Sequence, residues 1–451
     1  MTGPEAPPPA GSGGPGGPGG PGGGDGGGRR RSGVLEQTIL ICCLIGTAQM
    51  TWGVIVPVLP LFLGGLGIGV ALLGPIIAAF AIGRVISNVP AGLLLRRLRP
   101  RPYLYVIMLG LAAVTAVTGL APDPGWLIAA RVVAGLLGGA AVTVGFAVLV
   151  TGAPAERRGS AMATATVVQM SAGAVGAVLG GAVVTVTNVP ITFAVAAAPL
   201  LLVLLWDTLR PATHYWSAFD THRAPATPDT ATPDPATPAD PAPAQPTDSA
   251  TSTSSPGPAV AGRPGAGIVL AGLAVLSFAT FFARFAGEQG LIPVLAYGGG
   301  GLTPLTLGIA MAVATLGSLA MLPLVGRFID RGARLTVLLP AGVLGALALA
   351  SFPFLQLPLV FAGALIVYSM ASSAVAILPG VVTAERFGGK ASGAVVGLTR
   401  TAGDVGAAVG PIVVFALADA VNAEVASATM GAALLVAVVF FAVVMTTRPR
   451  P

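Results

Sequence analysis

Charge is scarce in this 451-residue sequence: only 9% of its residues are Asp, Glu, Lys or Arg, whereas 54% are hydrophobic. A soluble domain carries roughly 25% charged residues, which cover its water-exposed surface. A chain with so few charges cannot cover a surface of this size, and a soluble enzyme of several domains is therefore excluded. What remains is a helical membrane protein with many spans.

Lysine, histidine and cysteine are also scarce, and each scarcity excludes a kind of site. Lys390 is the only lysine and no Gly-x-x-x-x-Gly-Lys loop exists, which excludes an ATP-driven pump within this chain. The two histidines, His214 and His222, lie eight residues apart outside the apolar runs, and we expect no metal site. No Ser/His pair or carboxylate cluster can form within the apolar runs, so we expect neither enzymatic activity nor a cofactor.

Apolar runs are abundant and long enough to cross a bilayer. Two polar stretches, 1–32 and 207–265, contain too few apolar side chains to fold and are predicted to be disordered. They set off six-span halves at 33–206 and 266–446, followed by a tail at 447–451. The predicted fold is all-α, with twelve transmembrane helices in two pseudo-symmetric six-helix bundles. The spans lie at about 37–63, 70–95, 103–121, 126–151, 160–186, 190–208, 267–297, 303–326, 335–352, 357–382, 391–418 and 424–446.

Basic residues lie on one side of this topology. All but four of the 23 lysines and arginines fall in the termini and in the loops on the same side as the termini, and the opposite loops contain none. The positive-inside bias then predicts a multi-pass protein of the inner (plasma) membrane with both termini cytoplasmic. We expect the arginine-rich loops to face anionic lipid headgroups rather than nucleic acid. We also expect a monomer that binds a small-molecule substrate.

The two halves share short sequence patterns six spans apart. Val54–Leu59 is similar to Gly290–Leu295, and Gly176-x-x-x-Gly180 is matched by Gly406-x-x-x-Gly410. Two related six-helix bundles are the plan of many secondary transporters.

The loop after the eighth span, Gly326-Arg-Phe-Ile-Asp330-Arg331-Gly-Ala-Arg334, resembles the Gly-x-x-x-Asp-Arg-x-Gly-Arg loop of the major facilitator superfamily. The resemblance implies a gating loop on the cytoplasmic side. After the second span Gly92 and Arg97 fit this pattern, but Arg96 occupies the aspartate position. Asp330 is therefore expected to be the one loop aspartate that stabilises a neighbouring helix N-terminus.

Two further patterns resemble signatures of that family. Arg131-x-x-x-Gly135-x-x-x-Gly139 resembles a signature of proton-coupled members, and so deep an arginine needs a partner, a watery cavity or an outward path. The fifth span resembles the Gly-Pro-x-x-Gly-Gly signature of drug:proton antiporters, with Ala177 at the proline position. Close helix packing explains its small residues equally well. The packing or hinge candidates in the fifth and eleventh spans are Gly176, Gly180, Gly181, Gly406, Gly410 and Pro411.

Ionisable residues within the spans are the best candidates for function, because they are costly there. Glu288 lies four residues after Arg284, and Asp404 lies four residues after Arg400, so each pair shares a helix face. We predict that Asp404 or Glu288 couples transport to protons; a purely structural ion pair is the alternative. The candidates for the substrate cavity or for charge partners are Arg84, Asn88, Arg131, Arg284, Arg400 and Gln49.

These observations predict proton-driven efflux of a drug-like compound or secondary metabolite by alternating access, with the proton gradient as energy source. Proton-coupled uptake of an organic anion or nutrient is the alternative that the arginine excess favours. A non-transporting receptor or scaffold is a third possibility, and it leaves the charges within the spans unexplained.

Overall fold

The computed structural model describes Gly3 and residues 26–154, 157–221, 266–387 and 390–447. Every regular element among these residues is a helix, and twelve helical segments are long and apolar enough to span a membrane. The expected all-helical fold with twelve spans is confirmed. Bilayer physics explains it, because a helix satisfies its backbone hydrogen bonds within one segment.

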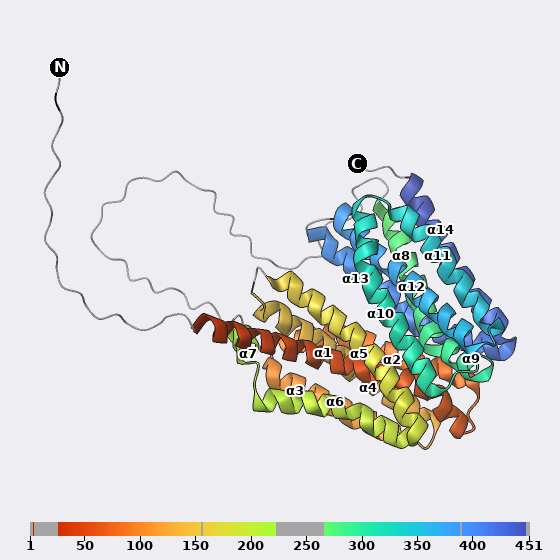
Figure 1. Cartoon of the computed structure of the whole chain (residues 1–451), viewed down its shortest axis with the longest axis horizontal. Helices are drawn as coiled ribbons and strands as arrows, with labels where there is room; N and C mark the ends of the chain where they lie inside the picture. The colour runs from red at the N-terminus through yellow and green to blue at the C-terminus, as the bar shows by residue number, and fades with distance from the viewer. Residues whose placement is uncertain (1–2, 4–25, 155–156, 222–265, 388–389, 448–451) are drawn as a thin grey trace.

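The first six spans form the N-terminal bundle (Figure 1). Its elements are α1 (Gly26–Gly65), the short η1 (Val70–Leu72), α2 (Leu73–Leu95), α3 (Pro100–Thr118), α4 (Pro124–Gly152), α5 (Arg158–Val186) and α6 (Val189–Leu209). The seventh span is made of α8 (Ala266–Ala283), η4 (Arg284–Leu291) and α9 (Ile292–Gly298). The remaining elements of the C-terminal bundle are α10 (Pro304–Asp330), α11 (Arg334–Ser351), η5 (Phe352–Phe354), α12 (Pro358–Arg386), α13 (Lys390–Ala420) and α14 (Ala423–Thr447).

Short polar caps start several spans on the side of the molecule opposite the termini. The Asp123 carboxylate accepts a hydrogen bond from Trp126 N at 2.9 Å, and the Asn188 side chain accepts one from Ile191 N at 3.0 Å. Thr303 and Thr306 cap each other's backbone at the start of α10. A proline follows each of these caps within the first helical turn, where its missing N–H costs nothing.

Small residues let the helices of each bundle approach closely. A Cβ at Gly180 of α5 would meet the Val54 carbonyl oxygen of α1, and a Cβ at Gly406 of α13 would meet the Phe278 carbonyl oxygen of α8. These two contacts occupy equivalent places in the two bundles. Gly135, Gly176 and Gly410 lie equally close to a neighbouring helix backbone. Close packing by small residues is the interaction that holds helices together where the solvent is lipid.

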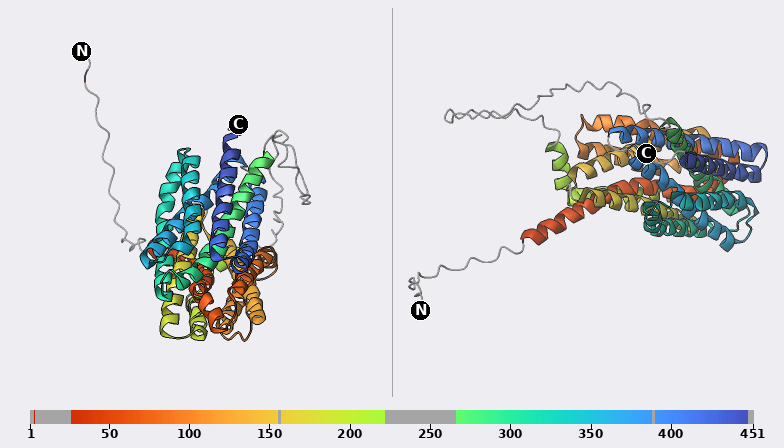
Figure 2. Two further views of the ribbon diagram at one scale, coloured as in Figure 1. Left: turned by 90° about the vertical axis from the view of Figure 1, so that its right-hand side faces the viewer. Right: turned by 90° about the horizontal axis from the view of Figure 1, so that it is seen from above.

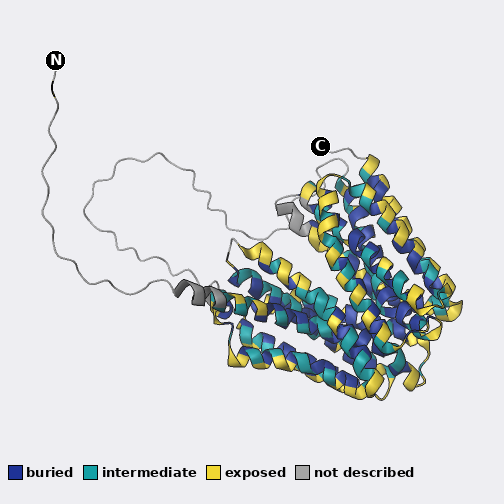
Figure 3. Cartoon of the chain, in the orientation of Figure 1, coloured by how far each residue is buried: buried dark blue, intermediate teal, exposed yellow. Residues whose placement is uncertain are grey.

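The two bundles touch mainly on the side away from the termini. There α5 packs on α10, because a Cβ at Gly181 would meet the Pro304 carbonyl oxygen. At the equivalent place α2 packs on α13, where a Cβ at Gly74 would lie 2.6 Å from the Pro411 carbonyl oxygen. From this contact the bundles diverge like a V toward the side that carries the start of α1 and the end of α14 (Figures 1 and 2). Buried residues gather where the arms meet (Figure 3). The structure is thus open toward the side of the termini.

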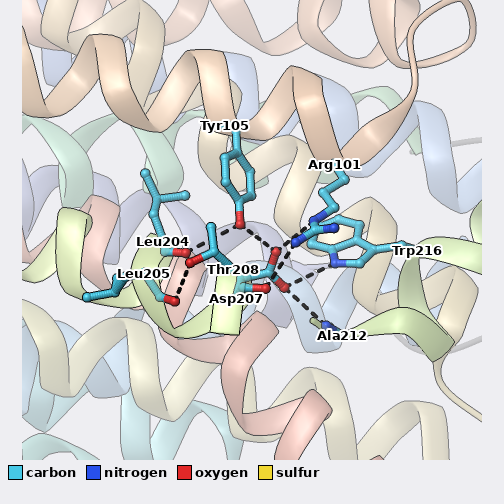
Figure 4. A network of polar contacts seen from close by, with 8 residues as sticks. All are labelled: Arg101, Tyr105, Leu204, Leu205, Asp207, Thr208, Ala212 and Trp216. Atoms are coloured by element: carbon cyan, nitrogen blue, oxygen red, sulfur yellow. Dashed lines mark hydrogen bonds and ion pairs between the residues drawn. The ribbon is translucent and has the colours of Figure 1, made fainter. Parts of the chain in front are cut away.

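The boundary predicted at residue 207 is wrong, because the chain stays ordered to residue 221. After α6, helix α7 (Thr213–Thr221) packs against the ends of α1, α3 and α4. The Asp207 side chain is fully buried and accepts hydrogen bonds from Arg101 Nε at 2.9 Å, Tyr105 OH at 2.7 Å, Trp216 Nε1 at 3.1 Å and Ala212 N at 3.1 Å (Figure 4). We call these five residues the Asp207 cluster. The average composition of residues 207–265 did not reveal α7, because only a few aromatic side chains and one carboxylate hold this helix in place.

Tyr215 of α7 makes a second set of contacts with the bundle, to α1 and α4. Its hydroxyl lies 2.6 Å from the Thr38 hydroxyl, and its ring fills the space that a side chain at Gly152 would need. Burial raises the pKa of the Tyr215 hydroxyl, which therefore stays protonated and able to donate. His214, predicted to lie in a disordered linker, belongs to α7. His222 and most of the predicted linker and N-terminal tail lie outside the described residues, but α1 begins at Gly26 rather than after residue 32.

The charge bias predicts that the side of the termini faces the cytoplasm, and labelling of single cysteines can test this prediction. In a background with Cys42 and Cys43 replaced by alanine, we expect Gly65→Cys to react with a membrane-impermeant maleimide in intact cells. Ser160→Cys is the matched variant on the opposite side, and it should react only after permeabilisation. Both positions are exposed in the structure. Labelling of Ser160→Cys in intact cells would reverse the orientation.

Candidate functional site

A cavity of about 210 Å³ lies between the two bundles, just inside the place where they meet. Helices α1, α2 and α5 contribute one wall, and α8, η4 and α10 contribute the other. Aromatic, amide and charged side chains converge there, as in most sites for small organic ligands. The lining includes Gln49, Trp52, Phe80, Arg84, Gln169, Met170, Phe281, Arg284, Phe285, Glu288, Gln289, Met311 and Thr315.

The seventh span changes from α-helix to π-helix at the cavity. The π-helical segment η4 covers Arg284–Leu291, and three of its polar side chains line the cavity: Arg284, Glu288 and Gln289. A π-helical turn is rare, and it is found frequently at functional sites. The sequence patterns predicted one continuous helix here and missed this feature.

An ion pair between Arg84 of α2 and Asp404 of α13 connects the two bundles. Arg84 Nη2 lies 3.1 Å from Asp404 Oδ1, and the Asp404 side chain is 8% exposed against 23% for Arg84. The Arg84 guanidinium also lies 5.4 Å from the centre of the Phe285 ring. A Cβ at Gly139 would lie 2.8 Å from Arg84 Cγ, so this glycine makes room for the arginine.

The partner of Asp404 therefore differs from the one that sequence spacing suggested. Arg400 lies one helical turn from Asp404, but it is exposed and the cavity lining does not include it. Arg284 and Arg400 both lie close enough to Arg84 to repel it electrostatically. This region therefore holds three arginines and two carboxylates: Arg84, Arg284 and Arg400 with Asp404 and Glu288.

The second pair, Arg284 with Glu288, forms within η4 as its spacing predicted. Arg284 Nε lies 3.7 Å from Glu288 Oε2, which is beyond hydrogen-bond distance. Among the described residues, the Arg284 side chain makes no hydrogen bond, and it is 36% exposed. The donors of this guanidinium are therefore open to the cavity.

In the ranges that the structure describes, Arg131 has neither the carboxylate partner nor the outward path that its sequence position suggested, and it does not line the cavity. The side chain does not reach outward and has no carboxylate partner in the described part of the chain; it is 1% exposed. Its guanidinium lies 6.0 Å from the Trp52 ring centre and 5.7 Å from the Phe80 ring centre. Its Nε and Nη1 atoms have no hydrogen-bond partner there. The two rings, stacked with centres 4.2 Å apart, line the cavity, whereas Arg131 is not among the lining residues.

The other predicted residues divide between the cavity and the side of the termini. Gln49 lines the cavity, whereas the lining does not include Asn88. In the loop after α10, Asp330 and Arg331 are exposed, and Arg334 Nη2 lies 2.6 Å from Glu385 Oε1 at the end of α12. The remaining loop residues, Gly92, Arg97 and Gly326, lie at the same ends of the spans.

Sequence reasoning missed the aromatic and amide side chains of the cavity. Trp52 Nε1 donates a hydrogen bond of 2.9 Å to Gln289 Oε1, and this contact joins α1 to η4 across the bundles. The Trp52 and Phe285 ring centres lie 6.1 Å apart. The adjacent residues Glu288 and Gln289 could have indicated a polar site in the seventh span, because two neighbouring polar residues are unusual inside a span.

Comparisons with known proteins agree with this architecture. A family model described as Major Facilitator Superfamily matches residues 41–298 and 273–451. Two crystal structures of a bacterial homologue of the human lysosomal transporter Spinster are similar in fold, one inward-facing and unoccupied, the other inward-facing and occupied. The first has a TM-score of 0.62 at 14% identity and covers 92% of this chain and 96% of that one. The second has a TM-score of 0.59 at 16% identity and covers 92% and 95%. No curated protein matches the sequence.

Proposed function

This chain belongs to the major facilitator superfamily, and we propose that it exports a small organic molecule in exchange for protons. The family and the solved neighbours are transporters and not enzymes, so the chain is a transporter of the lipid bilayer. Proton coupling, the direction of transport and the cytoplasmic position of the termini belong to the proposal.

The observation that carries the proposal is the ion pair between Arg84 and Asp404. It joins the two bundles at the base of the open V, with its carboxylate nearly buried. Protonation of Asp404 removes the charge that holds Arg84, and return of Arg84 to the carboxylate expels the proton. A carboxyl group whose cationic partner lies on the other moving body can therefore link proton binding to bundle motion.

The observed conformation fits one stage of an export cycle. With the termini in the cytoplasm, the V is open inward, and Asp404 is paired with Arg84 as after proton release. In this conformation the cavity can receive cargo from the cytoplasmic side before the bundles rock outward. The small residues of α5, which resemble the drug:proton antiporter signature, also favour the export branch.

The direction of coupling can be measured in everted membrane vesicles that contain the protein. Respiration acidifies the lumen, and a ΔpH-sensitive dye reports protons leaving it when a substrate is exchanged inward. We expect members of a panel of aromatic acids, amides and amines to release lumenal protons, and vesicles without the protein to show no release. No response to any compound that the protein binds would contradict proton exchange.

Proton-coupled uptake of an organic anion is the second candidate, and the charge of the cavity favours it. Arg84 and Arg284 line the cavity against the single carboxylate of Glu288. A symporter would carry anion and proton the same way, so the same vesicles would show protons leaving only when the substrate is preloaded into the lumen. Accumulation of that substrate by intact cells would establish uptake.

A further inference from the structure

We propose that the substrate is a small aromatic monoanion, which places its acid group on Arg284 and its flat body against the aromatic wall of the cavity. The inference rests on the proposed function only in treating this cavity as the substrate site. It names the chemical class of cargo and the residue that selects it.

The first observation is the availability of Arg284. Asp404 holds Arg84 with a short ion pair, and Arg131 does not line the cavity. Arg284, by contrast, is loosely paired with Glu288 at 3.7 Å and more than a third exposed. A guanidinium offers five donors in a planar fork, which matches two carboxylate oxygens. Arg284 is therefore the cavity-lining cation with its fork open to a ligand.

The second observation is the excess of positive charge around that fork. Arg284 and Arg400 both lie near Arg84, and Glu288 and Asp404 are the two carboxylates paired with arginines of this region. Three arginines and two carboxylates leave an excess of one positive charge around the cavity. An anionic ligand that displaces Glu288 from Arg284 offsets this excess, whereas a cationic ligand increases it. At the low dielectric of a membrane site such a difference decides which ligands bind.

The third observation concerns the shape and chemistry of the walls. The Phe281 and Phe285 rings lie nearly parallel, at 12°, with centres 6.4 Å apart, and Trp52 lies beside Phe285. These rings offer stacking surface to a flat apolar body. The amides of Gln49 and Gln169 face the same space and supply neutral hydrogen bonds. A flat apolar body with one acid group would therefore use the aromatic wall, the amides and the Arg284 guanidinium of the cavity.

The class of cargo is compatible with proton exchange. One proton moving inward and one monoanion moving outward transfer two positive charges inward in total. A membrane potential that is negative inside therefore drives export in addition to the pH gradient. Arg284 and Asp404 are different residues, so cargo and proton do not compete for one group.

Calorimetry on the purified full-length protein tests the inference with 2-naphthoate, 2-naphthamide and 2-(aminomethyl)naphthalene. These share one ring system and differ in charge. We expect naphthoate to bind at least tenfold more tightly than the amide, and the amine not to bind. Arg284→Gln should remove this preference while leaving the amide affinity within twofold. Arg327→Gln, which removes an exposed arginine of α10, should leave the preference intact.

A second variant keeps the test decisive if Arg284→Gln does not fold. Glu288→Gln frees Arg284 from its carboxylate neighbour, and we expect it to tighten naphthoate binding severalfold. Equal affinity for acid and amide, no binding of any of the three compounds, or weaker naphthoate binding to Glu288→Gln would each overturn the inference. These measurements are made without a gradient, so failure of proton coupling would leave them unaffected.

Discussion

Replacing Asp404 with asparagine is expected to abolish transport driven by a pH gradient. The amide has nearly the shape of the carboxylate and can still accept a hydrogen bond from Arg84, but it cannot bind and release a proton. Proteoliposomes that contain the variant should show no uphill accumulation in response to a pH gradient. Equilibrium binding of substrate should remain measurable, because Asp404 is absent from the cavity lining.

Asp419→Asn is the matched control for this prediction. Asp419 lies on the same helix, α13, but it is exposed near the end away from the termini, and its replacement should leave transport unchanged. Glu288 is the other carboxylate within the cavity region, and Glu288→Gln should be tested alone and with Asp404→Asn. If both variants and their combination still transport uphill on a proton gradient, the coupling does not use a membrane-embedded acid and our proposal is wrong.

Replacing Asp207 with alanine should destabilise the N-terminal bundle by about 3 kcal/mol, because it leaves several buried donors without an acceptor. Arg101 is 37% exposed and can partly turn to water, which moderates the loss. The Tyr105 hydroxyl can still donate to the Leu204 carbonyl oxygen, at 3.3 Å, whereas the Trp216 indole N–H, on a side chain that is 6% exposed, has no such alternative within the described residues. We expect a lower unfolding temperature in detergent, and a red-shifted Trp216 emission as α7 detaches.

The exposed pair of Arg210 and Glu36 provides the control, because it joins the end of α6, three residues after Asp207, to α1 at 3.3 Å. Surface ion pairs are worth between zero and about 1 kcal/mol, so Glu36→Gln should change stability little. If Asp207→Ala is no less stable than Glu36→Gln, the Asp207 cluster does not hold α7 in place. Asp207→Asn should fall between the two, because the amide keeps one acceptor oxygen.

The sequence by itself determined the number and order of the spans. The bilayer imposes the same requirement on every spanning segment. The segment needs about 20 consecutive, mostly apolar residues, and its backbone hydrogen bonds must form within the segment. Local composition is enough to recognise it. Glycines spaced four apart, as in Gly176 and Gly180, similarly indicate one packed helix face, because helical periodicity is a local property.

Only the tertiary structure decided which charged residues meet. Spacing along one helix paired Asp404 with Arg400, whereas folding paired it with Arg84, more than three hundred residues away. Spacing identifies the residues that share a helix face but not the residue that lies opposite. The same limit concealed the stacked rings over Arg131, the contact of Trp52 with Gln289 and the helix α7 held by Asp207. Each of these depends on side chains from different helices, whose relative placement is fixed by the packing of the whole bundle.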